Sequence, residues 1–85
     1  MILLHQNEPN PFEEQTTIQY HIPYDFRRAK LVIGSIDGSV VKIVNIKEKG
    51  TGKLTLFKDE IMQGYYSYTL IIDGVKVSTK KMMKQ

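Results

Sequence analysis

The side chains that most often carry out chemistry in proteins are few in this chain and lie far apart. A metal site needs histidine or acidic ligands at close spacing, but the two histidines, His5 and His21, are distant in sequence. His21 falls on the polar face of an alternating segment, so we interpret it as an exposed strand residue. The chain has no cysteine, which leaves neither a thiolate metal ligand nor a disulfide. The sequence therefore predicts no metal site.

Acid–base catalysis is not indicated either. The acidic pairs Glu13-Glu14 and Asp59-Glu60 lie in connections, where solvated carboxylates are usual. Catalysis would need two carboxyl groups held in a cleft with different environments, and no such cleft is predicted. The glycines in residues 50–52 lack the strand-to-helix context of a phosphate-binding loop. We predict a protein that is not an enzyme and that uses no cofactor.

Three closely spaced tyrosines, Tyr65, Tyr66 and Tyr68, offer a last kind of chemistry. Exposed together, their rings would form a platform for carbohydrate. The alternation of the segment instead favours Tyr66 and Tyr68 as core rings whose hydroxyl groups reach the rim of the fold.

The elements that position these residues read as β-strands nearly throughout, because apolar and polar residues alternate. Asp37-Gly38 and Asp73-Gly74 are hairpin turn signals. Residues 47–53 are predicted to be a flexible charged turn, and residues 58–64 a corner with Ile61 inward. The predicted strands are 16–22, 29–36, 39–46, 54–57, 65–72 and 75–83. Short strands at this spacing predict an all-β, immunoglobulin-like antiparallel β-sandwich of about seven short strands. A closed small barrel is the alternative.

Alternation also predicts which side chains face the core. In the last strand it places Lys76, Ser78, Lys80 and Met82 on one face and Val75, Val77, Thr79 and Lys81 on the other. In the earlier strands the apolar and aromatic residues that share one face are Ile18, Tyr20, Ile22, Leu31, Ile33, Leu54, Leu56, Tyr66, Tyr68, Leu70 and Ile72.

Composition and charge are those of one folded domain, with 85 residues, 41% hydrophobic and 25% charged. The net charge is +3, and many of the lysines lie near the end of the chain. Nucleic-acid binding is disfavoured, because the only arginines are Arg27 and Arg28. No apolar run is long enough to cross a membrane, and residues 1–4 are too short for the core of a signal peptide. We expect either a cytoplasmic chain or a fragment of an exported protein.

Two prolines around one asparagine mark the beginning of the chain. Proline carries no N–H and fixes φ, so Pro9-Asn10-Pro11 cannot lie inside a sheet. We predict that residues 1–15 are an extended, proline-containing lead-in or first strand, and that residues 16–85 are the sandwich, all within one domain. Phe12 then places its ring on an apolar surface.

Taken together, these motifs resemble type A C-terminal sorting domains of the type IX (Por) secretion system. The stretch "LLHQNEPNPFEEQTTIQYHIP" is similar to the opening of that family, and "LVIGSIDGSVVKIV" to its next hairpin. "IMQGYYSYTLIIDGVKVSTKKMMKQ" is similar to its ending. Gly34 and Ser35 depart from the pattern, which usually has an aromatic and an acidic residue there. The resemblance covers essentially the whole chain.

The resemblance implies a secretion signal that directs an N-terminal passenger across the outer membrane. A covalently attached passenger, an outer-membrane shuttle and a sortase-like peptidase that removes the domain are the implied partners. The implied route runs through the periplasm to the cell surface or the medium.

The resemblance also suggests which residues are recognised. The lead-in motif comprises Asn7, Pro9, Asn10, Pro11 and Phe12. The residues expected to contact the shuttle or translocon are Gly64, Tyr66, Lys80, Lys81, Met82 and Met83. Lysines on an edge strand also discourage aggregation, and Gly64 also suits a special backbone conformation.

Two other functions remain open. The chain is alternatively a non-catalytic immunoglobulin-like module that binds carbohydrate or protein through its tyrosines. It is otherwise a self-assembly module of a surface protein, in which a detachable first strand is exchanged between the two copies of a homodimer.

Overall fold

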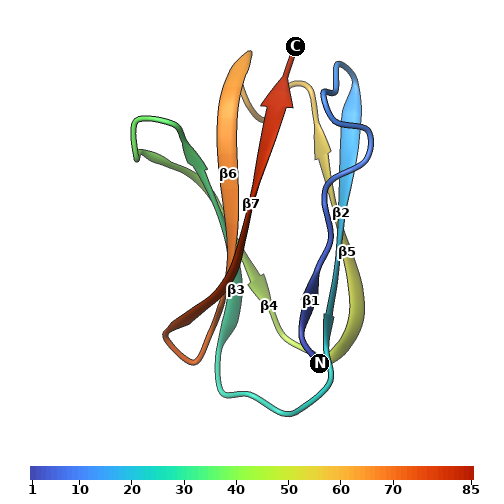
Figure 1. The fold of residues 1–85 in the computed structure, drawn as a ribbon, viewed down its shortest axis with the longest axis vertical. Coiled ribbons are helices and arrows are strands. Elements are labelled where there is room, and N and C mark those ends of the chain that lie inside the picture. The colour runs from blue at the N-terminus through green and yellow to red at the C-terminus, as the bar shows by residue number, and fades with distance from the viewer.

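Seven β-strands form two antiparallel sheets that lie face to face in the computed structural model, which describes residues 1–85 (Figure 1). The strands are β1 (Leu3–Leu4), β2 (Gln15–Ile22), β3 (Ala29–Ser35), β4 (Val40–Ile46), β5 (Gly50–Phe57), β6 (Gly64–Ile72) and β7 (Val75–Lys84). The predicted all-β antiparallel sandwich is confirmed. The structure holds no helix that could cross a membrane.

The strand order combines hairpins of consecutive strands with pairings between strands that are distant in sequence, β2 with β5 and β3 with β6. One sheet has the order β1-β2-β5 and the other the order β4-β3-β6-β7. The β3–β4 and β6–β7 hairpins turn at Asp37-Gly38 and Asp73-Gly74, as predicted, and both glycines have positive φ. The chain changes sheets between β2 and β3, between β4 and β5, and between β5 and β6. β4 and β7 are the edges of the larger sheet.

The core lies between the sheets and follows the predicted alternation. Ile18, Leu56 and Tyr68 are among the fully buried side chains, and Ile61 of the corner after β5 is buried as expected. Tyr20 and Leu54 are half-buried and pack against the core from its margin. The core residues are Leu4, Phe12, Ile18, Ile22, Ala29, Leu31, Ile33, Ile46, Leu56, Ile61, Tyr66, Tyr68, Leu70, Ile72 and Met82.

The prediction of a flexible turn over residues 47–53 is wrong at its second half. β5 begins at Gly50, and residues 50–53 pair with the second half of β2. The reason is the ring of Tyr20, which crosses the backbone of Gly52. A Cβ on Gly52 would lie 2.3 Å from the Cζ atom of Tyr20. Glycine within a strand here marks a close approach, and alternation alone does not reveal such a site.

The predicted faces of β7 hold only for its second half. The pairing with β6 shifts at Leu70/Ile71, so that Leu70 pairs with Ser78 but Ile71 pairs with Lys76. Val77 is the extra residue of this bulge, and it packs against the core. Lys76 is exposed and does not share the inner face with Met82. A bulge inserts one residue and reverses the alternation beyond it.

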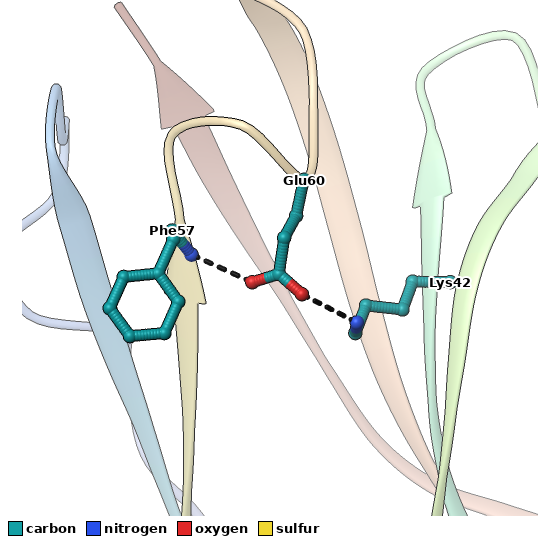
Figure 2. A network of polar contacts seen from close by, with 3 residues as sticks. All are labelled: Lys42, Phe57 and Glu60. Carbon is teal, nitrogen blue, oxygen red and sulfur yellow. Dashed lines mark hydrogen bonds and ion pairs between the residues drawn. The ribbon is translucent and has the colours of Figure 1, made fainter.

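Glu60 links the two sheets at the edge formed by β4 and β5 (Figure 2). One carboxylate oxygen lies 2.6 Å from Lys42 Nζ on β4, and the other accepts the N–H of Phe57 at 2.8 Å. The hydrogen bond from Lys42 lowers the pKa of the Glu60 carboxyl most, and the hydrogen bond from the Phe57 N–H lowers it further. The corner after β5 is thereby attached to the opposite sheet.

Candidate recognition site

Tyr68 of β6 is the centre of polar contacts between the first residues of the chain and the larger sheet. Its ring is fully buried on the inner face of the sheet. Its hydroxyl group accepts the N–H of Asn7 at 2.8 Å and donates to the carbonyl of His5 at 2.7 Å. Burial raises the pKa of Tyr68 from 10.0 to about 12, so the hydroxyl keeps its proton, and its role as a donor, further into the alkaline range than an exposed tyrosine does. One side chain therefore anchors two backbone groups of the lead-in.

Asn7 is buried and organises the lead-in around Pro9. Its Nδ2 donates to the Pro9 carbonyl at 3.2 Å and to Thr16 Oγ1 at 3.0 Å, and Thr16 donates to the same carbonyl at 2.8 Å. Its Oδ1 accepts from Gln6 Nε2 at 2.8 Å. No buried side-chain polar atom of the protein lacks a partner. Asn7 thus has a structural role, because its side chain provides a hydrogen bond to the Pro9 carbonyl, which is not paired in a β-ladder.

The lead-in then runs beside the end of β7, although the two segments lie at opposite ends of the sequence (Figure 1). The N–H of Phe12 donates to the Met83 carbonyl at 3.1 Å, and the N–H of Gln85 donates to the Phe12 carbonyl at 2.9 Å. Asn10 Oδ1 accepts the N–H of Met83 at 2.9 Å. The edge of β7 is therefore covered by the lead-in at this end. The peptide bonds that precede Pro9 and Pro11 are both cis.

The buried ring of Phe12 holds this junction together. Lys84 Nζ lies 6.0 Å from the centroid of the ring, and the Lys84 side chain is itself buried. Lys84 pairs with Gly64, the first residue of β6. Gly64 has φ of 152°, which side chains rarely adopt, so a backbone reason accounts for glycine there.

The predicted recognition residues of β7 divide between the two faces of the sheet. Met82 is buried and pairs with Tyr66, whose hydroxyl donates to the Met62 carbonyl at 2.6 Å. Lys81 and Met83 point to the outer face, where Lys81 is exposed and Met83 is half-buried. Tyr65, the partner of Met83, is 60% exposed and extends this surface. A protein partner would reach these outer side chains without opening the fold.

Lys80 lies on the other side of the strand from Lys81. It pairs with Tyr68 and is half-buried at the margin of the core. Gln6 Nε2 donates to the carbonyl of Lys81 at 2.5 Å, which adds a further contact between the lead-in and β7. No lysine of β7 takes part in an ion pair, so their charges are not neutralised within the protein.

The structure brings the two predicted groups of residues into one site. Asn10 and Phe12 of the lead-in contact the backbone of Met83, while Gly64 and Tyr66 lie on the neighbouring strand. Pro9, Asn10 and Pro11 form a bend between Glu8, which pairs with β2, and Phe12, which pairs with β7.

Three contributors to this site were not predicted from the sequence. Tyr68 was expected in the core, but its partners lie in a segment far away in sequence. Lys84 lies two residues after the buried Met82, so the alternation of the strand could have predicted that the Lys84 side chain also faces inward. Gln6 belongs to the opening motif, but its contact was not predicted, because that contact depends on where the lead-in crosses β7.

The lead-in and the end of β7 thus meet in one ordered surface at one end of the sandwich. The chain belongs to the secretion system C-terminal sorting domain family, whose model matches residues 9–85, nearly the whole chain. No curated protein matches the chain. The role of this domain is therefore that of a sorting signal for type IX secretion, and its destination is the cell surface or the outside of the cell. This family is one of signals and not of catalysts.

Proposed function

We propose that the outer-membrane shuttle of the type IX system binds this domain at the end of β7, and that a sortase-like peptidase then removes the domain from an N-terminal passenger. The main support is the junction between Phe12 and Met83, where two backbone hydrogen bonds join the lead-in to β7. The first residues of the chain lie at the other end of the sandwich from the end of β7 (Figure 1). A shuttle bound at the end of β7 would therefore leave the N-terminal passenger boundary free for the peptidase.

The residues that we assign to the shuttle contact are the accessible ones, namely Lys81, Met83 and the half-buried Lys80. Tyr66, Met82 and Gly64 support this surface from within, because two are buried and the third starts the strand. Unpaired lysines favour a partner surface with negative charge. Methionine adapts to apolar surfaces of varied shape.

The experiment is an export assay in a host with a working type IX system. Residues 1–85 are fused to the end of a fluorescent periplasmic passenger, and fluorescence is compared in periplasm, surface and medium. The variant Lys81→Ala/Met83→Ala should leave the passenger in the periplasm. Deleting the end of β7 is a poorer test, because that end contains the buried Met82 and Lys84.

The matched control is Lys53→Ala/Phe57→Ala. It also removes one lysine and one apolar residue from an edge strand, and Phe57 is 51% exposed. Export should continue in this variant. Equal export by both variants, with both folded, would reject the assignment of recognition to β7. Periplasmic retention of the unaltered fusion would reject the shuttle proposal as a whole.

Removal of the domain by the peptidase is measured separately. The mass of the exported passenger should show that residues 1–85 have been lost, and export of the intact fusion would contradict this part of the proposal. The tyrosine-based binding module has less support, because only Tyr65 of the three tyrosines is exposed. The strand-exchanged homodimer remains a prediction, which sedimentation at increasing concentration would test.

A further inference from the structure

A basic hollow lies at the end of the sandwich away from the junction of the lead-in with β7. The loop between β2 and β3, the last residues of β4 and the β6–β7 turn surround it, and its volume is about 1200 Å³. It lies at the opposite end of β7 from Met83, since β7 begins at that turn. Apolar groups form part of its wall, with Phe26 half-buried and Ile46 buried. A ligand here would not compete for the candidate recognition site.

The hollow carries a concentrated positive charge. Four cationic side chains line it, Arg27, Arg28, Lys30 and Lys47, together with one carboxylate. This difference alone equals the net charge of +3 of the whole chain, so the remainder of the molecule is neutral overall. Charges gathered in this way attract an anionic ligand far better than charges dispersed over the surface.

The carboxylate, that of Asp73, does not neutralise the arginines. Its Oδ1 accepts the backbone N–H groups of Arg27 and Arg28, each at 2.9 Å, and so fixes the loop that carries them. Nearby Asp25 is not among the lining residues, and its carboxylate is paired with Lys49 at 3.2 Å. None of the four cations of the hollow forms an ion pair. The loop is held by backbone contacts while both guanidinium groups remain available.

An open strand edge leads into the hollow. β4 pairs with β3 on one side only, and its last residues, Asn45 and Ile46, line the hollow. Val40 and Ile43 are 59% and 51% exposed. The one charged residue of β4, Lys42, is directed toward Glu60 (Figure 2). Edge strands usually carry charges or proline that prevent pairing, and β4 lacks this protection.

We propose that β4 and the basic hollow together bind an extended segment of a partner protein that combines apolar and acidic residues. The segment adds as a further strand beside β4, and its acidic side chains lie in the hollow. Backbone hydrogen bonds along the edge supply affinity, and the arginines supply selectivity for acidic sequences. A small free anion would use the hollow alone and would leave the edge of β4 unpaired, so the two features together favour a peptide.

The test begins with selection, since the partner sequence is unknown. A displayed library of random peptides about twelve residues long, enough to span a typical strand, is selected on immobilised chain 1–85. Enriched peptides should combine acidic residues with alternating apolar ones. Their affinity should fall about tenfold or more in Arg27→Ala/Arg28→Ala, which leaves the backbone contacts to Asp73 in place. The control Lys53→Ala/Lys58→Ala loses the same charge and should bind normally.

Amide chemical shifts then locate the bound peptide. An enriched peptide should shift and protect amides from Val40 to Ile46 as well as those around the hollow. Shifts confined to the hollow and reproduced by inorganic phosphate would overturn the proposal in favour of a small-anion site. Concentration-dependent dimerisation through β4 without peptide would identify a second copy as the occupant, and would also overturn it. Enrichment of peptides without acidic residues, or no enrichment at all, would do the same.

Discussion

At the scale of single residues, Tyr68 shows how a core side chain can also make hydrogen bonds that fix a distant segment. Its ring fills the space between the sheets, and its hydroxyl group bonds both Asn7 and His5 of the lead-in. The ring therefore contributes to the apolar core and the oxygen to the arrangement of the first residues. The two contributions can be separated experimentally.

Replacing Tyr68 by phenylalanine should lower the free energy of unfolding by about 1–3 kcal/mol. The ring stays, but the N–H of Asn7 and the carbonyl of His5 lose their partner. Urea denaturation measures the change. The matched control is Tyr65→Phe, whose hydroxyl lies on an exposed side chain and which should be nearly neutral. Equal effects of the two substitutions would contradict the anchoring role of Tyr68.

Tyr68 also predicts a pH dependence in the alkaline range. The folded protein holds its pKa at about 12, against 10.0 for the ordinary group, because burial disfavours the phenolate. Between these values the unfolded chain has released the proton and the folded chain has not. The free energy of unfolding should therefore fall as pH rises from about 10 to about 12. Lysines also titrate there, so the check is the difference between the native chain and Tyr68→Phe, which should lose this part of the slope.

At the scale of elements, β5 shows how one close contact sets the length of a strand. Its first residues pair with β2 because Gly52 leaves room for the ring of Tyr20. The absence of a side chain at Gly52 thus allows the pairing of β5 with β2 to extend to Gly50. Glu60 then fixes the end of the same strand against Lys42 of the other sheet.

The substitution Gly52→Ala should destabilise the fold by about 1–3 kcal/mol, the usual range for overpacking. The added methyl group would meet the Tyr20 ring at 2.3 Å, and the ring would have to move. In a Tyr20→Ala background the same substitution should have little effect, so a double-mutant cycle measures the contact. Additive effects of the two changes would show that the backbone of Gly52 and not the ring is responsible.

At the scale of the whole molecule, the fold joins the lead-in to the end of the last strand. The lead-in crosses from β2 of one sheet to β7 of the other and covers the last part of the β7 edge. The opposite edge, at β4, has no such cover. One side of the sandwich is therefore closed by its own chain, and the other side is open to a partner.

The variant Asn10→Ala should loosen this closure locally. It removes the acceptor for the N–H of Met83, a hydrogen bond of about 0.5–1.5 kcal/mol. Hydrogen exchange at Met83 and Gln85 should become faster by up to about tenfold, while amides at the β6–β7 turn keep their rates. Asn45→Ala, an exposed asparagine elsewhere, is the control. Uniformly faster exchange throughout the chain would instead indicate a loss of global stability.

Alternation of apolar and polar residues was sufficient to predict much of this fold. Ile18, Leu31 and Leu70 are buried, and the residues next to them are not, because a strand presents every second side chain to the same face. The Asp-Gly turns were predictable as well, since glycine adopts positive φ at no steric cost. The family was indicated by the lead-in and by the tyrosine strand. These signals are all local, so the sequence by itself determined them.

Only the tertiary structure decided which distant segments meet. The bulge at Val77, the pairing of residues 50–53 and the contacts of Tyr68 depend on groups far away in sequence. The same holds for the junction of Phe12 with Met83 and for the basic hollow around Arg27, each assembled from separate segments. Local periodicity fixes the direction of a side chain along its own strand. Which residues that side chain then contacts depends on how the strands pair and how the two sheets pack.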